Sequence, residues 1–267
     1  MKYEPKMSNI EGFCRLCGNY SKLSFEHIPP RRAFNDQQQA FQTMQDLLGN
    51  RSRTKFRKGL GQQSICERCN NLTGAWYGEA YVSWAKQGLV WLNRLSENNQ
   101  FSLPYHIKPL NVLKQIVVMS LAMASDAALD YHSEVRQFVL NREQKYLPPY
   151  YRVYAYLTAD GSPRFASGMA VMNIQTGASN YIDSEIALPP FGYCVTSSKR
   201  KQNSSLAEEQ DLCEIGWLSN FDYNIWTTIF LRLPLLETHM PFPLDYRSKA
   251  EVEEHNRKSV LDSLPVN

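Results

Sequence analysis

The chain has 267 residues with 43% hydrophobic and 12% aromatic content, which is enough apolar material for a full core and for two domains. Its formal net charge is only +3, so the overall charge excludes neither acidic nor basic partners. Residues 1–100 carry 14 basic against 8 acidic side chains, and the remainder carries 15 against 18. Affinity for a polyanion is therefore expected in the first third of the chain.

The hydropathy of the chain excludes a membrane span. The longest apolar stretch, residues 116–124, is broken by Ser120 and is too short to cross a bilayer. No apolar signal region follows Met1. We expect a cytoplasmic protein with no membrane partner.

Turn residues and apolar periodicity predict the elements of the first third. Residues 12–30 are expected to form a cysteine-bearing turn and a short hairpin, because glycine and proline interrupt their apolar residues. A short helix is expected from residue 37 to Gly49. Aromatic and aliphatic residues at helical intervals over residues 76–95 predict a long amphipathic helix, whose aromatic stripe is expected in the core.

Two Xaa-Pro pairs at residues 103–109 predict a linker, which divides the chain into domains of residues 1–100 and 101–267. Helices are expected at residues 110–121 and 135–139, and a peripheral helix at residues 246–264. Strands bounded by Gly and Pro are expected at residues 151–158, 165–174, 180–188, 191–196, 214–219 and 225–233. The expected fold class is α+β, with helices and an antiparallel β-sheet in the second domain.

The strongest chemical signal is a pair of Cys-x-x-Cys motifs, Cys14/Cys17 and Cys66/Cys69. Four thiolates on two such turns complete the tetrahedral shell of a structural Zn²⁺. Two disulfides are the alternative, but nothing in the sequence indicates an oxidising compartment. A thioredoxin-like redox site is disfavoured because neither motif lies in a βαβ pattern.

Further candidate residues lie between and directly behind the cysteine motifs. The tract Glu26-His27-Ile28-Pro29-Pro30 precedes the second motif, and Asn70-Asn71 follows it. A carboxylate offers an oxygen ligand, and an imidazole with a pKa of about 6.5 accepts protons near neutral pH. The alternatives are a structural role for His27 beside the cysteines and an ordinary surface position for Glu26.

Together these motifs resemble the HNH endonucleases of the ββα-metal type that carry a structural zinc, over about residues 12–80. The resemblance implies an N-terminal zinc-braced ββα-metal module that hydrolyses phosphodiester bonds in DNA. It implies that His27 is the general base and that Glu26 and Asn70 hold a catalytic Mg²⁺ or Mn²⁺. It also suggests a role in restriction or phage defence, with residues 101–267 serving recognition, regulation, homodimerisation or binding of a partner protein.

The chain departs from the family at the middle Asn of the HNH name. Many relatives carry Asn a few residues before the second cysteine motif, where this chain has Gly61-Gln62-Gln63-Ser64. Gln62 or Gln63 is a candidate replacement by hydrogen bonding. Asn50, from the segment between the motifs, is another.

Basic side chains in the first third are candidates for binding nucleic acid, with DNA favoured over RNA. If residues 51–58 are extended, four cations share one face of the strand and can follow a phosphate backbone. These four are Arg51, Arg53, Lys55 and Arg57. Arg31 and Arg32 are candidate phosphate clamps. The alternative for the basic run is a solvated loop.

Two other functional classes remain open from the residues. One is a zinc-dependent nucleic-acid-binding or adaptor protein that keeps the fold without the reaction. The other is a module that binds only proteins through its larger second domain. Loss of cleavage with retention of DNA binding would distinguish the first from a nuclease.

Overall fold

The structure of the protein is a computed structural model. It describes residues 10–36, 39–41, 54–56, 59–94, 102–124, 129, 132–159, 163–172, 179–197 and 212–236. For residues 39–41, 54–56, 168–172 and 179–183 only the backbone is described.

The fold is mixed α+β with antiparallel sheets, as expected. The helices are α2 (Glu67–Thr73), a π-helical turn η1 (Gly74–Gly78), α3 (Glu79–Leu92), α4 (Pro109–Met123), α5 (Ser133–Leu140) and a 3₁₀ turn η3 (Gly216–Asn220). The strands are β1 (Glu11–Phe13), β2 (Tyr20–His27), β3 (Gln39–Phe41), β4 (Thr54–Phe56), β5 (Gly61–Cys66), β6 (Leu103–Ile107), β7 (Tyr151–Leu157), β8 (Arg164–Met172), β9 (Ser179–Leu188), β10 (Phe191–Ser197), β11 (Cys213–Glu214) and β12 (Thr227–Leu231).

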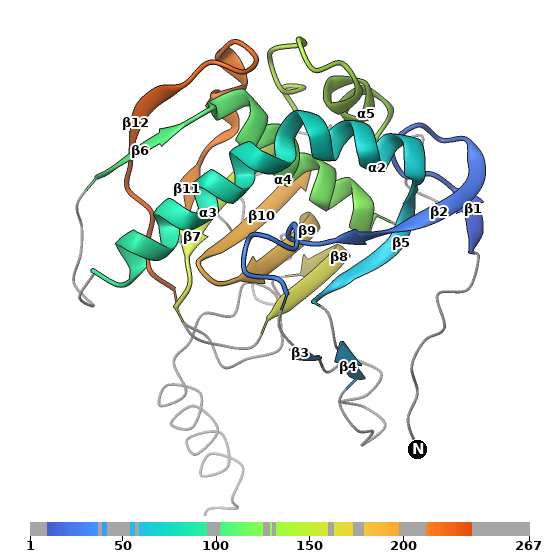
Figure 1. Ribbon diagram of the computed structural model, residues 1–267, viewed down its shortest axis with the longest axis horizontal. Helices are drawn as coiled ribbons and strands as arrows, with labels where there is room; N and C mark the ends of the chain where they lie inside the picture. Colours follow the sequence, from blue (N-terminus) through green and yellow to red (C-terminus); the bar gives the residue numbers. More distant parts are fainter. Residues whose placement is uncertain are drawn as a thin grey trace, which may run out of the picture.

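Helix α4 lies at the centre of the molecule. Its residues 109–122 are all buried, as expected of a mostly apolar helix, and they include the polar Asn111, Lys114, Gln115 and Ser120. It packs against α3 on one side and against β8, β9 and β10 on the other (Figure 1). The core is therefore built around α4.

The larger sheet has the strand order β11-β7-β10-β9-β8, and its described pairs are antiparallel. Trp84 of α3 ties this sheet to the first part of the chain. Its Nε1 donates to the Tyr193 hydroxyl at 2.8 Å, and its ring stacks on Phe191 with centroids 4.4 Å apart. One hydrophobic core thus crosses residue 100. The division into two domains at that point stays a prediction.

The smaller sheet, β1-β2-β5, carries the cysteine-bearing turn and leads directly into α2. Strand β2 pairs with β5 in antiparallel register, with an irregularity between Ser24 and Phe25. The helical run α2-η1-α3 then crosses the molecule to its far end (Figure 1). The expected hairpin and long helix are both present, with the helix beginning earlier, at Glu67.

Three expectations about local structure are wrong. The expected linker contains β6, which pairs with β12 and accommodates Pro104 because an edge strand tolerates a missing N–H. The strand expected at residues 214–219 ends at Glu214, whose Oε1 accepts the Gly216 N–H at 3.2 Å as the chain turns into η3. The residues Gln39–Phe41 form β3, paired with β4, where a helix was expected.

Some of the expected elements lie outside the residues that the structure describes. The rest of the expected helix up to Gly49 lies outside the described residues, and so does the helix expected at residues 246–264. Within the described ranges, none of the helices has the length and apolar character needed to cross a membrane.

Candidate metal centre and active site

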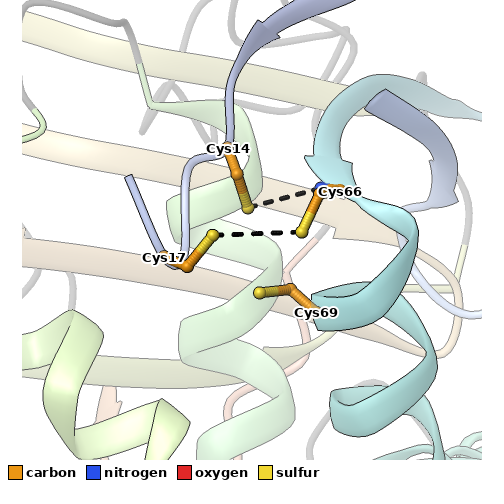
Figure 2. A group of neighbouring side chains, drawn as sticks. All are labelled: Cys14, Cys17, Cys66 and Cys69. Carbon is orange, nitrogen blue, oxygen red and sulfur yellow. Dashed lines mark hydrogen bonds between the residues drawn. The ribbon is translucent and has the colours of Figure 1, made fainter. Parts of the chain in front are cut away.

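The four cysteines of the two motifs form one cluster (Figure 2). Cys14 and Cys17 lie in the turn between β1 and β2, whereas Cys66 ends β5 and Cys69 lies in the first turn of α2. Their sulfur atoms all lie within 4.8 Å of one another, and the Cys17 and Cys66 Sγ atoms are 3.9 Å apart. Zinc–sulfur bonds of about 2.3 Å in a tetrahedron place sulfurs about 3.8 Å apart. The cluster is therefore compatible with a structural zinc site.

One member of the cluster, Cys14, favours the thiolate form that metal binding requires, whereas burial and the neighbouring thiols raise the pKa of Cys17 and Cys69. All six cysteines are free thiols, so the disulfide alternative is not realised. A hydrogen bond from the Cys69 thiol, with further bonds from backbone N–H groups, lowers the pKa of Cys14 to about 4 against the effect of burial. One of those backbone donors is the Cys66 N–H, 3.3 Å from the Cys14 sulfur.

The turn that carries Cys14 and Cys17 is held from outside the motif. Gly18 adopts a φ of +77°, which an L side chain rarely adopts, and the guanidinium of Arg136 packs against it. The Arg136 Nε donates to the Leu16 carbonyl at 2.8 Å. The Arg15 N–H donates to the Ser64 carbonyl at 2.9 Å and so joins the turn to β5. No sequence pattern pointed to Arg136, which lies 120 residues from Leu16.

The structure brings Glu26 and Asn70 together at the end of β2. The Asn70 Nδ2 donates to the Ser24 Oγ at 3.0 Å and to the Phe25 carbonyl at 3.3 Å, and the Asn70 side chain also hydrogen-bonds the Glu26 carboxyl group. Glu26 is only 8% exposed, so it is not the surface carboxylate of the alternative interpretation. Burial raises the pKa of Glu26 to about 7, although the bond from Asn70 opposes the rise. No basic side chain forms an ion pair with Glu26 among the described residues.

His27 occupies the other side of the same strand end. Successive strand residues point to opposite faces, so His27 shares a face with Phe25 and not with Glu26. The His27 ring meets the Phe25 ring edge-on, with centroids 5.0 Å apart. Its strand partner is Gly61, and its side chain is half-buried. Among the three proposed catalytic residues, the structure therefore unites two and places the third on the opposite face.

A residue that the sequence reasoning missed, Asn35, closes the segment between β2 and β5. Its Nδ2 donates to the Pro29 and Leu60 carbonyls, and its Oδ1 accepts the Leu60 N–H, each at 2.7 Å. Asn35 is completely buried, and Gly59, with a φ of +94°, packs against its backbone. The loop that follows His27 is thus fixed by an asparagine from within the intervening segment.

Three residues are candidate replacements for the family's middle Asn, and the two that the structure describes, Gln62 and Gln63, make different contacts. Gln62 is the strand partner of Glu26, but its Nε2 donates to the Ala122 carbonyl of α4. Gln63 pairs with Phe25, on the face that carries His27. Asn50 lies outside the described residues.

Replacing Asn35 by alanine is expected to lower the free energy of unfolding by about 3 kcal/mol, because the Pro29 carbonyl and the Leu60 N–H lose this partner. The Leu60 carbonyl loses one of two bonds and keeps the one from the Ile28 N–H. Chemical denaturation measures the change. The exposed Asn93 offers a matched control, and Asn93→Ala is expected to change stability by less than about 0.5 kcal/mol. A loss of less than about 1 kcal/mol for Asn35→Ala would contradict the closing role of this side chain.

The basic residues proposed to bind nucleic acid are only partly described. Arg31 and Arg32 are exposed directly behind the Pro29-Pro30 pair, and Arg32 forms an ion pair with Glu79 whose partners are 66% and 73% exposed. Such exposed pairs contribute little to stability. Lys55 lies in β4, so its backbone is extended as the phosphate-tracking interpretation requires. Arg51, Arg53 and Arg57 lie outside the described residues.

The arrangement as a whole is two antiparallel strands followed by a helix, with β2, β5 and α2 in that order. It places a buried carboxylate beside a carboxamide, next to a cluster of four thiols. No family model, curated protein or solved structure matches the chain. The resemblance to HNH endonucleases stays a prediction that rests on the motifs and on this geometry.

Proposed function

We propose that the protein is a metal-dependent endonuclease of the HNH type that hydrolyses phosphodiester bonds in DNA. The observation that supports this best is the contact between Glu26 and Asn70 at the end of β2. The sequence proposes Glu26 and Asn70 as the two ligands of one ion, and their side chains are in direct contact. They come from different elements, because Glu26 lies in β2, Asn70 lies in α2, and β5 lies between them in the chain. An ordinary structural carboxylate would be expected to contact a cation or to face solvent.

The donor set at this point fits a hard divalent ion. A carboxylate and a carboxamide oxygen are ligands that Mg²⁺ accepts, together with water and substrate phosphate. In the described part of the chain the Asn70 amide makes its hydrogen bonds through Nδ2, which leaves Oδ1 for an ion. When bound, Mg²⁺ or Mn²⁺ would polarise the scissile phosphate and stabilise the leaving 3′ oxygen.

His27 is assigned the proton transfer. A neutral imidazole nitrogen would take a proton from the attacking water as its oxygen bonds to phosphorus and the bond to the 3′ oxygen breaks. The attacking and leaving oxygens of such a displacement lie in line on opposite sides of phosphorus. Because Glu26 and His27 are successive residues of one strand, their side chains can flank a single phosphate at its end.

The cysteine cluster is assigned a structural zinc in this proposal. It connects the β1–β2 turn to the junction of β5 and α2, and these elements carry Glu26 and Asn70. The zinc would thus hold the two ligands of the second ion in register. The proposed contacts to phosphate come from Arg31, Arg32, Arg51, Arg53, Lys55 and Arg57. Residues 101–267 would recognise the substrate, form a homodimer or bind a partner protein, in restriction or phage defence.

Cleavage of supercoiled plasmid DNA with Mg²⁺ or Mn²⁺ tests the proposal. The wild-type protein is expected to give nicked and linear products. Glu26→Gln keeps the size of the side chain but removes its charge, and is expected to slow cleavage by about a hundredfold, equivalent to about 3 kcal/mol.

Glu67 provides the matched control, because it is an exposed carboxylate at the start of α2. Glu67→Gln is expected to cleave within about twofold of the wild type. Identical background cleavage by the wild type and by Glu26→Gln would reject the nuclease. DNA binding without cleavage would then favour the non-catalytic binding protein.

A further inference from the structure

The β6–β12 ribbon, residues 103–107 paired with residues 227–231, presents an exposed aromatic face. Burial alternates along both strands, so one face packs on the core and the other meets solvent. On the outer face, Phe230 is 66% exposed and Trp226, just before β12, is 46% exposed. Large aromatic side chains in such positions mark a binding surface more often than isolated apolar residues do.

Basic side chains lie beside these aromatic rings. The Lys108 Nζ lies 5.1 Å from the centre of the Trp226 ring, and the His106 ring stacks on the same indole with centroids 5.2 Å apart. Arg232 is the next outward-facing residue after Phe230 and is exposed. Residues 102–108 and 223–236 contain no Asp or Glu. Within these two segments, the outer face of the ribbon therefore carries aromatic and basic side chains, with Pro104 and Thr228 among them, and no acid.

The ribbon is held rigidly by polar contacts from the helices. The Gln87 side chain of α3 pairs with the backbone of His106, donating to its carbonyl and accepting its N–H, both at 2.8 Å. The Trp91 Nε1 donates to the Pro104 carbonyl at 3.0 Å. The Asn111 Oδ1 of α4 accepts the Asn224 N–H at 2.9 Å. Side chains of α3 thereby hydrogen-bond the backbone of β6, so the strands that carry the exposed rings are already ordered before a ligand binds.

We propose that the outer face of this ribbon binds an unpaired nucleic-acid strand, with bases stacked on Trp226 and Phe230 and phosphates beside Lys108 and Arg232. Unpaired bases stack on aromatic side chains whatever their sequence, and interleaved cations neutralise the backbone between them. The two rings are four residues apart, or about 14 Å along the strand, so each would take a separate base. The surface favours a polyanion over an apolar protein partner, because the charged side chains described on it, Lys108 and Arg232, are both basic.

The class of partner rests on the proposed function, but the ribbon is a different surface from the proposed active site. The helical run from Glu67 to Gln87 rises by about 30 Å. Figure 1 accordingly shows β6 and β12 at the far end of α3 from β1, β2 and β5. Binding at the ribbon can therefore be measured separately from cleavage near Glu26. The sequence did not indicate this local basic surface, because residues 101–267 have a net negative charge. A net charge summed over many residues does not show how basic and acidic side chains are distributed over the surface.

Fluorescence anisotropy with a labelled thymidine oligonucleotide tests the inference, using full-length, zinc-loaded Glu26→Gln protein without Mg²⁺. Replacing Trp226 and Phe230 together by alanine is expected to weaken binding by about tenfold or more. Phe230→Ser alone, at a solvent-exposed position, is expected to weaken binding by about fivefold without changing the melting temperature. Arg232→Gln is expected to reduce the slope of log affinity against log salt by about 0.7.

Trp217→Ala is the matched control, because Trp217 is 38% exposed on η3 and lies outside the ribbon. It is expected to bind within about twofold of its parent. Failure of the parent protein to bind the oligonucleotide, or equal binding by the ribbon variants, would overturn the inference. A change in oligomeric mass in the double variant with unchanged binding would assign the face to a second copy instead. If the ribbon binds the oligonucleotide but the wild-type protein does not cleave plasmid DNA, only the nuclease proposal is rejected.

Discussion

Removing the zinc proposed for the four-cysteine cluster is expected to unfold the part of the protein that carries Glu26 and Asn70. The cluster joins the β1–β2 turn to the start of α2, and the strands between them are short. A structural zinc contributes about 10–16 kcal/mol of binding free energy in small zinc-binding peptides. Because whole domains are stable by only about 5–15 kcal/mol, loss of the ion is expected to abolish the native state of this region.

Cys69→Ser is the variant that tests this expectation. Metal analysis of the purified wild-type protein should give one zinc per chain, and the variant should lose both the zinc and the cooperative melting transition followed by circular dichroism. Cys213→Ser provides the control, because Cys213 is a free thiol in β11, outside the cluster. A Cys69→Ser protein that melts like the wild type, or a wild-type protein without zinc, would contradict the structural role.

Features with local signals were predictable from the sequence. The cysteine spacing predicted the cluster, because two residues between thiols suit a tight turn around one ion. Helical periodicity predicted α3 and the core position of Trp84, which is fully buried. The four strands β7 to β10 of the larger sheet were also foreseen, since glycine and proline mark their ends.

Features that depend on distant pairing were not predictable. Strand β6 was interpreted as a linker for two reasons. Its partner β12 lies more than a hundred residues further along the chain, and Pro104 is a residue that rarely lies within a strand. Asn35 is one polar residue in a loop, and no periodicity indicates that its amide bonds the backbone of Leu60. The support of the first cysteine turn by Arg136 is equally non-local.

The candidate active site combines both kinds of feature. Glu26 and His27 drew attention as neighbours of the cysteine motifs, and the contact of Glu26 with Asn70 followed from the folding of β5 into α2. The burial of Glu26 was not foreseen. It depends on the packing of α2 and β5 over the end of β2, and it raises the pKa of the carboxyl group to about 7. A bound divalent cation would favour the ionised form of this group.

Replacing His27 by alanine is expected to slow DNA cleavage by about 10²–10⁴-fold, the usual contribution of a general base. Zinc content and melting temperature should stay close to those of the wild type, because the His27 side chain is half-buried and lies on the opposite face from Glu26.

The pH dependence separates a general base from a merely structural histidine. Cleavage by the wild type should fall at acid pH, because a protonated imidazole can no longer accept a proton from water. His27→Ala should lose the part of this decline that belongs to the imidazole, and added free imidazole should restore part of its rate. A slow variant that keeps the full wild-type pH profile and gains nothing from imidazole would place His27 among the structural residues, with its ring packed on Phe25.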